Sequence, residues 1–149
     1  MKIFVTGGAG FIGSNYARWV LHNTDHSVTV YDSLTYAGNL STMRDLDDSP
    51  RFSFVKGNIC HPDEIAQAMA GHDWVVHFAA ESHVDRSIIS PLDFVYTNVI
   101  GTVNLLNTAK DFWKQDLSYE NAHDGTWDAK RDHLFYHIST DEVYGSLGK

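Results

Sequence analysis

The sequence TGGAGFIG at residues 6–13 separates two runs of different apolar periodicity. The residues before it, KIFVT at 2–6, form a short β-branched and aromatic run that is typical of a buried strand. In residues 10–22, apolar side chains recur every four positions, which predicts a helix with one buried face. A strand, a glycine-rich turn and a helix in this order predict the first β–α unit of a parallel sheet. The helix face that the pattern would bury consists of Ile12, Tyr16, Trp19 and Val20.

The rest of the chain continues the alternation of strands and helices. It predicts an α/β fold of the Rossmann-like, doubly wound, three-layer type in one domain over residues 1–149. The polar segment 114–132 is interpreted as a long connection, for which Tyr119 and Trp127 are candidate anchors. Further strands are expected at 27–32, 51–56, 73–78 and 133–139, and further helices at 63–70 and 92–113. The last helix is expected to bury Val95, Val99, Val103, Leu106 and Trp113, with a second apolar set of Phe94, Leu105 and Phe112.

Composition excludes several classes of protein. The 149 residues carry 11 Lys plus Arg against 19 Asp plus Glu, a net charge of −8 that disfavours binding to a phosphate backbone. The single cysteine, Cys60, excludes an intramolecular disulfide and a zinc site built on cysteine pairs. No apolar run approaches the roughly 18–20 residues that span a bilayer, and no secretory signal pattern is present. The sequence therefore predicts a cytoplasmic protein without membrane or nucleic-acid partners.

The glycine-rich stretch has the spacing of a phosphate cradle, with glycines at Gly7, Gly10 and Gly13. In such a cradle the first glycine makes a tight turn, the second lets the main chain approach a diphosphate, and the third lets the helix pack closely. Asp32 follows 19 residues after Gly13, where a carboxylate can bind a ribose. Ser33 follows Asp32, and no arginine is adjacent to it that could neutralise a 2′-phosphate. This favours NAD over NADP. An ordinary glycine-rich loop and a turn-forming aspartate remain the alternatives.

Polar clusters also follow three of the other predicted strands. Asn58 and Ile59 follow the strand 51–56 and suit either an adenine edge or a simple turn. Residues 79–87 (AAESHVDRS) begin with two alanines that allow a flat ligand near the backbone. Ser82, His83 and Asp85 are too close in sequence for triad geometry, and the histidines show no metal-ligand spacing. Residues 139–145 (STDEVYG) hold two carboxylates that could supply an acid and a base, although the residues alone favour a charged loop or a helix N-cap.

Five motifs together resemble the extended short-chain dehydrogenase/reductases, and more narrowly the dTDP-glucose 4,6-dehydratase family. The resemblance covers residues 1–145 apart from 114–132. The pairing of YAGN and AAESHVDRS with STDEVYG is the specific part, because related epimerases lack the Asp-Glu pair. The five motifs are TGGAGFIG (6–13), DSLTYAGN (32–39), AAESHVDRS (79–87), TNVIGT (97–102) and STDEVYG (139–145).

The resemblance implies a reaction in which NAD+ oxidises the sugar of dTDP-glucose at C4, water leaves across C5 and C6, and hydride returns to C6. It implies Asp141 as the acid at the 6-hydroxyl, Glu142 as the base at C5, and Thr140 as a hydrogen-bonding partner of the sugar, with His83 on the substrate side. It also implies a homodimer through the helix 92–113. The implied cofactor residues are Gly7, Gly10, Phe11, Ile12, Gly13, Asp32, Ser33, Leu34, Thr35, Asn58, Ile59, Ala79, Ala80, Glu81 and Thr97.

Two departures from the family pattern bear on activity. Asn58 stands where the family usually has Asp, and its amide can still hydrogen-bond adenine. The family's Tyr-x-x-x-Lys pair does not occur in the 149 residues, nor do the last strands and the C-terminal domain, so we expect the isolated chain to be inactive. The alternatives are another nucleotide-sugar dehydratase or epimerase, and a non-catalytic NAD-binding protein.

Overall fold

A computed structural model of the chain describes residues 1–114, 117–118, 128–129, 132–140, 143 and 145. Five parallel strands form its main sheet in the order β3-β2-β1-β4-β7. The chain moves outward from β1 to β3 and then crosses back to β4, so the strand order reverses between β1 and β4. The predicted Rossmann-like fold is confirmed. The strands are β1 (Lys2–Thr6), β2 (Ser27–Asp32), β3 (Phe52–Lys56), β4 (Trp74–His77) and β7 (Leu134–His137).

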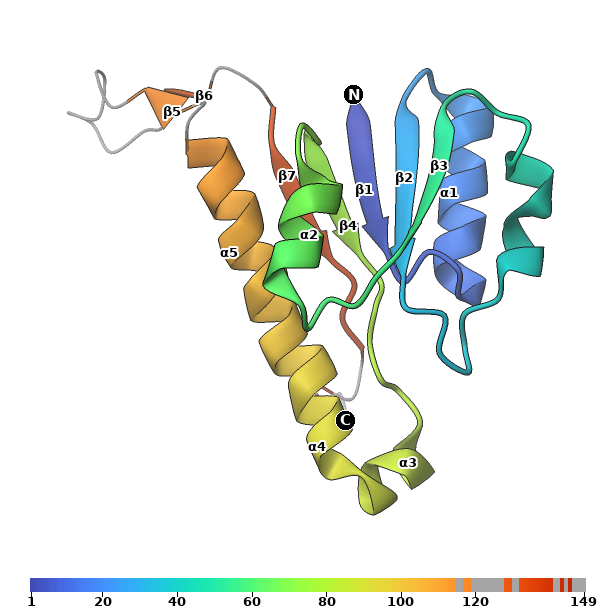
Figure 1. Cartoon of the computed structure of the whole chain (residues 1–149), viewed down its shortest axis with the longest axis vertical. Coiled ribbons are helices and arrows are strands. Elements are labelled where there is room, and N and C mark those ends of the chain that lie inside the picture. The colour runs from blue at the N-terminus through green and yellow to red at the C-terminus, as the bar shows by residue number, and fades with distance from the viewer. Residues whose placement is uncertain (115–116, 119–127, 130–131, 141–142, 144, 146–149) are drawn as a thin grey trace, which may run out of the picture.

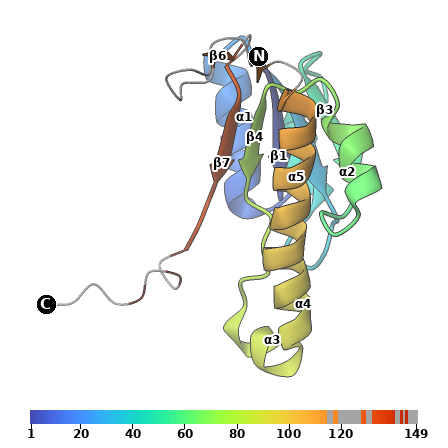
Figure 2. The same cartoon turned by 90° about the vertical axis from the view of Figure 1, so that its left-hand side faces the viewer.

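Helices cover both faces of the sheet, as Figures 1 and 2 show. The helix α1 (Phe11–Asn23) and the 3-10 helix η1 (Leu40–Leu46) lie on one face, and α2 (Pro62–Met69) and α5 (Thr102–Trp113) lie on the other. Along β1, Ile3 and Val5 pack toward α1 while Phe4 packs toward α2 and α5. This alternation gives two apolar cores. Because both faces of β1 are buried, its sequence is a continuous apolar run.

Three strands, β3, β4 and β7, are shorter than predicted. Arg51 lies just before β3, where its guanidinium donates to the carbonyls of Leu21, Thr24 and His26 at the end of α1. Asp73 lies before β4, and its carboxylate accepts from the Lys2 N–H. Two short helices were not predicted. They are η1, whose N-cap is Asn39, and α3 (Val84–Ile89).

The predicted apolar face of α1 is confirmed only at Val20, which is buried. Ile12 and Trp19 are 63% and 59% exposed, and Tyr16 is only partly buried. The helix lies so close to the sheet that small side chains make much of the contact, which an apolar pattern does not reveal. The buried residues of α1 are Gly13, Ser14, Ala17, Val20 and Leu21.

The predicted long helix exists, as the consecutive segments α4 (Pro91–Phe94), the π-helical η2 (Val95–Gly101) and α5. The first expected face is wrong except at Trp113, since its valines and Leu106 are all more than 40% exposed. The second expected set is confirmed at Leu105 and Phe112. The helix packs on the sheet through Leu105 and Ala109 instead, with Phe112 and Trp113 beside them. The exposed members of the expected face are Val95, Val99, Val103 and Leu106.

The polar segment before β7 contains one described pairing, between β5 (Leu117–Ser118) and β6 (Asp128–Ala129), which run antiparallel. Tyr119 and Trp127, the candidate anchors, lie outside the described residues. In the part of the chain that the structure describes, no helix is long and apolar enough to cross a membrane.

Candidate functional site

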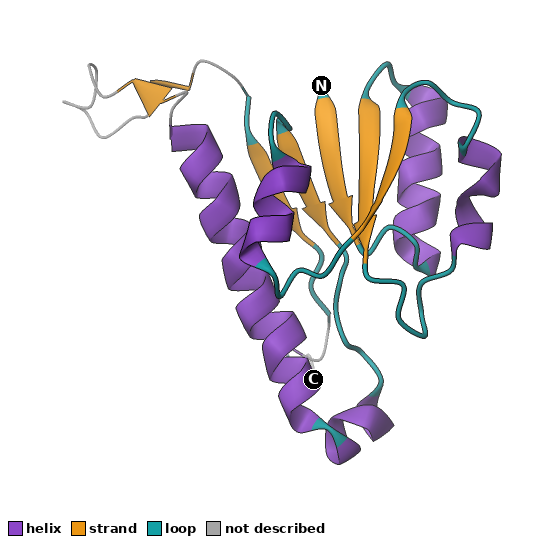
Figure 3. Cartoon of the chain, viewed as in Figure 1, coloured by secondary structure: helices purple, strands orange, loops and turns teal. Residues whose placement is uncertain are grey.

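The loops that follow β1, β2 and β4 gather at the carboxyl end of the sheet, where α3 and α4 also lie (Figure 3). Ligands of open parallel sheets bind at this end, beside the point where the strand order reverses. That point lies between β1 and β4 here. The candidate site therefore starts from the glycine-rich loop at the end of β1.

The glycines of the loop differ in how closely the chain packs around them. Gly7 has a φ of +70°, and a Cβ there would lie 2.5 Å from the Ala79 nitrogen. A Cβ on Gly13 would collide with the Gly7 carbonyl and lie 2.7 Å from the Gly8 Cα. On Gly10 it would meet only the Gly7 oxygen at 3.3 Å and the Ala37 oxygen at 4.0 Å. Gly7 and Gly13 are thus required by internal packing, whereas the chain is less crowded around Gly10.

The start of α1 is suited to an anion. Its N-cap is Gly10, no side chain caps it, and its first turn holds no acidic residue. The N–H groups of a first helical turn lack intrahelical partners and lie at the positive end of the helix dipole. Phe11 and Ile12 stand over this turn with 84% and 63% of their surface exposed. The loop and the helix end therefore fit a diphosphate with an apolar neighbour.

Asp32 ends β2 beside this loop and is 8% exposed. Its Oδ2 accepts from the Ala9 N–H at 3.0 Å, and its Oδ1 accepts from the Leu34 N–H at 2.8 Å. A carboxylate has about four acceptor positions, so two contacts leave it capacity for ribose hydroxyls. The carboxylate also fixes the glycine-rich loop, a structural role that the sequence does not reveal.

The chain turns back sharply after Asp32. Leu34 has a φ of +56°, which is uncommon for a residue with a branched side chain. The Gly38 N–H donates to the Thr35 carbonyl at 3.1 Å, and a Cβ on Gly38 would lie 2.6 Å from the Asp32 Oδ1. Ser33 and Thr35, two of the predicted cofactor residues, thus lie in a turn that is held against Asp32.

The residues after β3 are partly engaged in their own turn. The Asn58 Oδ1 accepts from the Cys60 N–H at 2.9 Å, and the Asn58 carbonyl accepts from the Tyr31 hydroxyl at 3.1 Å. Ile59 is 5% exposed and packs closely on Gly101 of the long helix. Any contact of Ile59 with a ligand would therefore come through its main chain.

Asn98 holds the loop after β4 in place. Its Oδ1 accepts from the Glu81 N–H at 2.8 Å, and its Nδ2 donates to the Glu81 carbonyl at 2.9 Å. Asn98 lies in the π-helical segment η2, next to the predicted site residue Thr97. Short π-helical turns occur frequently at functional sites. Ala79 and Ala80 precede Glu81 and lead out of the sheet beside Gly7.

A buried histidine links the sheet to the same helix. His77 is 1% exposed, and burial, followed by the nearby His137, lowers its pKa to about 4. Thr102 donates to the Asn98 carbonyl at 2.7 Å, so its hydroxyl oxygen accepts from His77 Nε2 at 3.0 Å. His77 Nδ1 then accepts from the Thr6 hydroxyl at 2.6 Å. The neutral tautomer with a proton on Nε2 satisfies all of these contacts.

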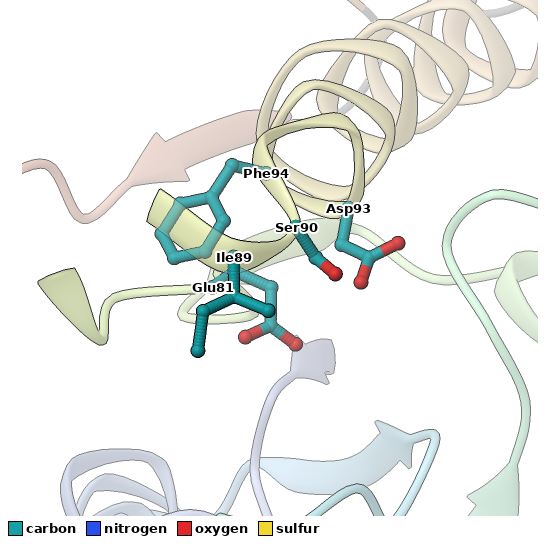
Figure 4. Close-up of a pocket in the computed structure, with 5 residues that line it drawn as sticks. All are labelled: Glu81, Ile89, Ser90, Asp93 and Phe94. Atoms are coloured by element: carbon teal, nitrogen blue, oxygen red, sulfur yellow. The ribbon is translucent and has the colours of Figure 1, made fainter. Parts of the chain in front are cut away.

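The predicted reactive residues are only partly described. Thr140 lies exposed after β7, while Asp141 and Glu142 lie outside the described residues. His83 is exposed, and its ring lies 5.1 Å from the ring of Tyr36. A cavity of about 240 Å³ lies nearby, lined by Glu81, Ile89, Ser90, Asp93 and Phe94 (Figure 4). Among the described residues, no cluster of His, Cys, Asp or Glu could hold a metal ion.

Three residues of this region were missed as parts of the site: Tyr36, His77 and Asn98. Tyr36 and Asn98 stand inside motifs that carry the family resemblance, YAGN and TNVIGT. The available signal for Asn98 was its amide side chain within the largely apolar helical stretch VYTNVIG at 95–101. His77 closes an apolar strand, where sequence alone does not distinguish a packed histidine from a functional one.

Comparison with known proteins gives a consistent result. The sequence model of the GDP-mannose 4,6 dehydratase family matches residues 4–149. The dTDP-glucose 4,6-dehydratase 1 of Escherichia coli (strain K12) is 49% identical over 149 residues, which is 99% of this chain and 39% of that protein. The chain thus spans well under half the length of this curated relative.

Solved structures agree with the sequence comparison. A dTDP-glucose 4,6-dehydratase from Streptomyces venezuelae, with NAD and TYD bound, has a TM-score of 0.81 and 43% identity, covering 100% of this chain and 42% of that chain. The UDP-Glc/GlcNAc 4-epimerase from Campylobacter jejuni has a TM-score of 0.69 and 33% identity, covering 74% of this chain and 34% of that chain. The dehydratase is therefore the more similar of the two.

Proposed function

The chain belongs to the GDP-mannose 4,6 dehydratase family, and we propose that it forms the dinucleotide-binding part of a dTDP-glucose 4,6-dehydratase. The observation that carries the proposal is the glycine-rich loop, least crowded at Gly10, beside the uncapped start of α1 and the Asp32 carboxylate. The identity of 49% to a dTDP-glucose 4,6-dehydratase across 99% of the chain supports the substrate class.

We propose that NAD is the cofactor and that the carboxyl end of the sheet binds it. The first-turn amides of α1 and the loop at Gly7, Gly10 and Gly13 receive the diphosphate, with Phe11 and Ile12 above it. The Asp32 carboxylate and the turn at Ser33, Leu34 and Thr35 receive the adenosine ribose, and Asn58 with the main chain of Ile59 receives adenine. Ala79, Ala80, Glu81 and Thr97 line the nicotinamide side.

When bound, NAD supplies the hydride acceptor and donor for the oxidation at C4 and the return of hydride to C6. We assign the proton transfers to the segment after β7. Glu142 takes the proton from C5, and Asp141 gives a proton to the departing 6-hydroxyl, so that one water molecule leaves. Thr140 hydrogen-bonds the reacting sugar oxygen, and His83 contacts the substrate from the loop after β4.

The proposal includes a homodimer built on the long helix. The outer side of η2 and α5 carries apolar side chains that this chain leaves exposed, which supports an interface there. These side chains belong to Val95, Tyr96, Val99, Ile100, Val103 and Leu106. A cytoplasmic location belongs to the same proposal.

Calorimetric titration of the purified chain with NAD+ tests the cofactor assignment. We expect one site per chain and, in Asp32→Ala, an affinity at least tenfold lower, because hydrogen bonds to a charged acceptor contribute about 1.5–3 kcal/mol. Asp48→Ala removes an exposed carboxylate and serves as the control. Incubation with dTDP-glucose should give no 4-keto-6-deoxy product, since the chain contains no Tyr-x-x-x-Lys. Failure of the unaltered chain to bind NAD+ would overturn the proposal.

A further inference from the structure

Tyr36 makes a contact that crosses the candidate site. It lies in the turn after β2, and its hydroxyl donates to the Glu81 Oε2 at 3.1 Å. Its ring lies 5.1 Å from the His83 ring at an interplanar angle of 30°. Glu81 and His83 belong to the loop after β4. One side chain therefore joins the loops of two strands through two independent contacts.

The strand order determines what this contact passes over. In the sequence β3-β2-β1-β4, the strand β1 lies between β2 and β4. A link from the loop after β2 to the loop after β4 must pass over the end of β1, where the glycine-rich loop lies. The Ala37 carbonyl, next to Tyr36, lies 4.0 Å from the position of a Cβ on Gly10. The turn that carries Tyr36 thus lies beside the glycine-rich loop at Gly10.

Both ends of the link are anchored. On one side, the Asn39 N–H donates to the Ala9 carbonyl at 3.1 Å, and Gly38 packs against Asp32. On the other side, the side-chain amide of Asn98 holds the main chain of Glu81 with two hydrogen bonds. Between these anchors the two loops meet through the side chains of Tyr36, Glu81 and His83.

We propose that Tyr36 is a positioning residue that acts as a clasp over the dinucleotide cradle and slows both uptake and release of the dinucleotide. This inference rests on the proposed cofactor site and adds to it a residue and a kinetic role. The clasp opens when the hydroxyl leaves Glu81 and the ring leaves His83. Because these contacts are made within the protein, opening limits uptake and release alike and leaves the equilibrium affinity nearly unchanged.

Stopped-flow measurements with NADH as the probe separate the two rates. Uptake is followed by mixing NADH with the chain, and release by displacing bound NADH with excess NAD+. Tyr36→Phe should raise both rates about fivefold, the effect of one hydrogen bond. Tyr36→Ala also loses the ring contact and should raise both rates about twentyfold. Tyr136→Phe, at a tyrosine that is 56% exposed on β7, is the matched control.

A double-mutant cycle identifies the partner of the hydroxyl. In Glu81→Ala the clasp has lost this acceptor, so adding Tyr36→Phe should raise both rates less than it does in the unaltered chain. Unchanged rates in both Tyr36 variants overturn the clasp while the cofactor proposal stands. A faster release with unchanged uptake also overturns it, because that result identifies Tyr36 as a direct ligand contact. Absence of NADH and NAD+ binding by the unaltered chain overturns both proposals. If Tyr36→Ala fails to fold, Tyr36→Phe decides alone.

Discussion

Removing the imidazole of His77 should remove an acid-dependent loss of stability. Burial lowers the pKa of His77 to about 4, whereas an unfolded chain gives a histidine about 6.5. Between these values the unfolded state binds more protons than the folded state, so the free energy of unfolding rises with pH across that window. The lowered pKa corresponds to a loss of about 3 kcal/mol in the free energy of unfolding across the whole window. At pH 5 the loss is about 2 kcal/mol.

The assay is urea unfolding, followed by tryptophan fluorescence, at several pH values from 7 to 4.5. The unaltered chain should lose about 2 kcal/mol between pH 7 and pH 5 through this residue. In His77→Gln the amide keeps a donor for Thr102 but does not titrate. The free energy of unfolding of this variant should be lower than that of the unaltered chain at pH 7. It should also change less on acidification. His22→Gln, at an exposed histidine of α1, is the control.

The result that refutes this reasoning is an equal dependence on pH in His77→Gln and the unaltered chain. Asp45, Glu64 and Asp111 also have lowered pKa values, through hydrogen bonds to Arg18, His61 and Lys114 respectively. A carboxylate with a lowered pKa loses its stabilising effect as the pH falls through the folded-state pKa, so these groups act toward the acid end of the range. The difference between the two proteins, rather than either curve alone, isolates His77.

Three further predictions concern packing and the cradle. Gly13→Ala should lower the free energy of unfolding by more than about 2 kcal/mol. Gly10→Ala, whose Cβ would meet one oxygen at 3.3 Å, should lower it by less than about 1 kcal/mol and weaken NAD+ binding measured by calorimetry. Leu105→Ala should lower the free energy of unfolding in urea by about 2–5 kcal/mol, while Leu106→Ala should lower it by less than about 1 kcal/mol. A larger loss in Leu106→Ala than in Leu105→Ala would contradict this prediction. Arg51→Met should cost about 2 kcal/mol in the same assay, because three carbonyls lose a charged donor.

The sequence predicts the strands and the site loops well because local signals determine them. The run KIFVT and the glycines after it fix β1 and the start of α1, and the structure agrees with both. The position of Asp32 follows from its place at the end of a strand. Its two hydrogen bonds to main-chain N–H groups do not, because they depend on how two loops approach one another in space.

The buried face of the long helix was predicted only in part, because the helix is apolar on more than one side. An apolar repeat shows that a face avoids water, but not which neighbour covers it. In this structure Leu105 and Ala109 pack against the sheet, and the more regular repeat of valines is exposed on the outer side of the helix. Gly101 decides the choice, since a Cβ there would lie 2.6 Å from the side chain of Ile59. A small residue at a close approach leaves no periodic signal.

The neutral state of His77 connects the core with the candidate site. Its Nδ1 accepts from Thr6 only while that nitrogen carries no proton, and its Nε2 donates to Thr102, which in turn donates to the Asn98 carbonyl. Asn98 then holds the main chain of Glu81. Protonation of His77 would turn the Thr6 contact into two donors facing one another unless the hydroxyl rotated away. The proton that lowers stability would therefore also disturb the first member of the hydrogen-bonded series that ends at Glu81.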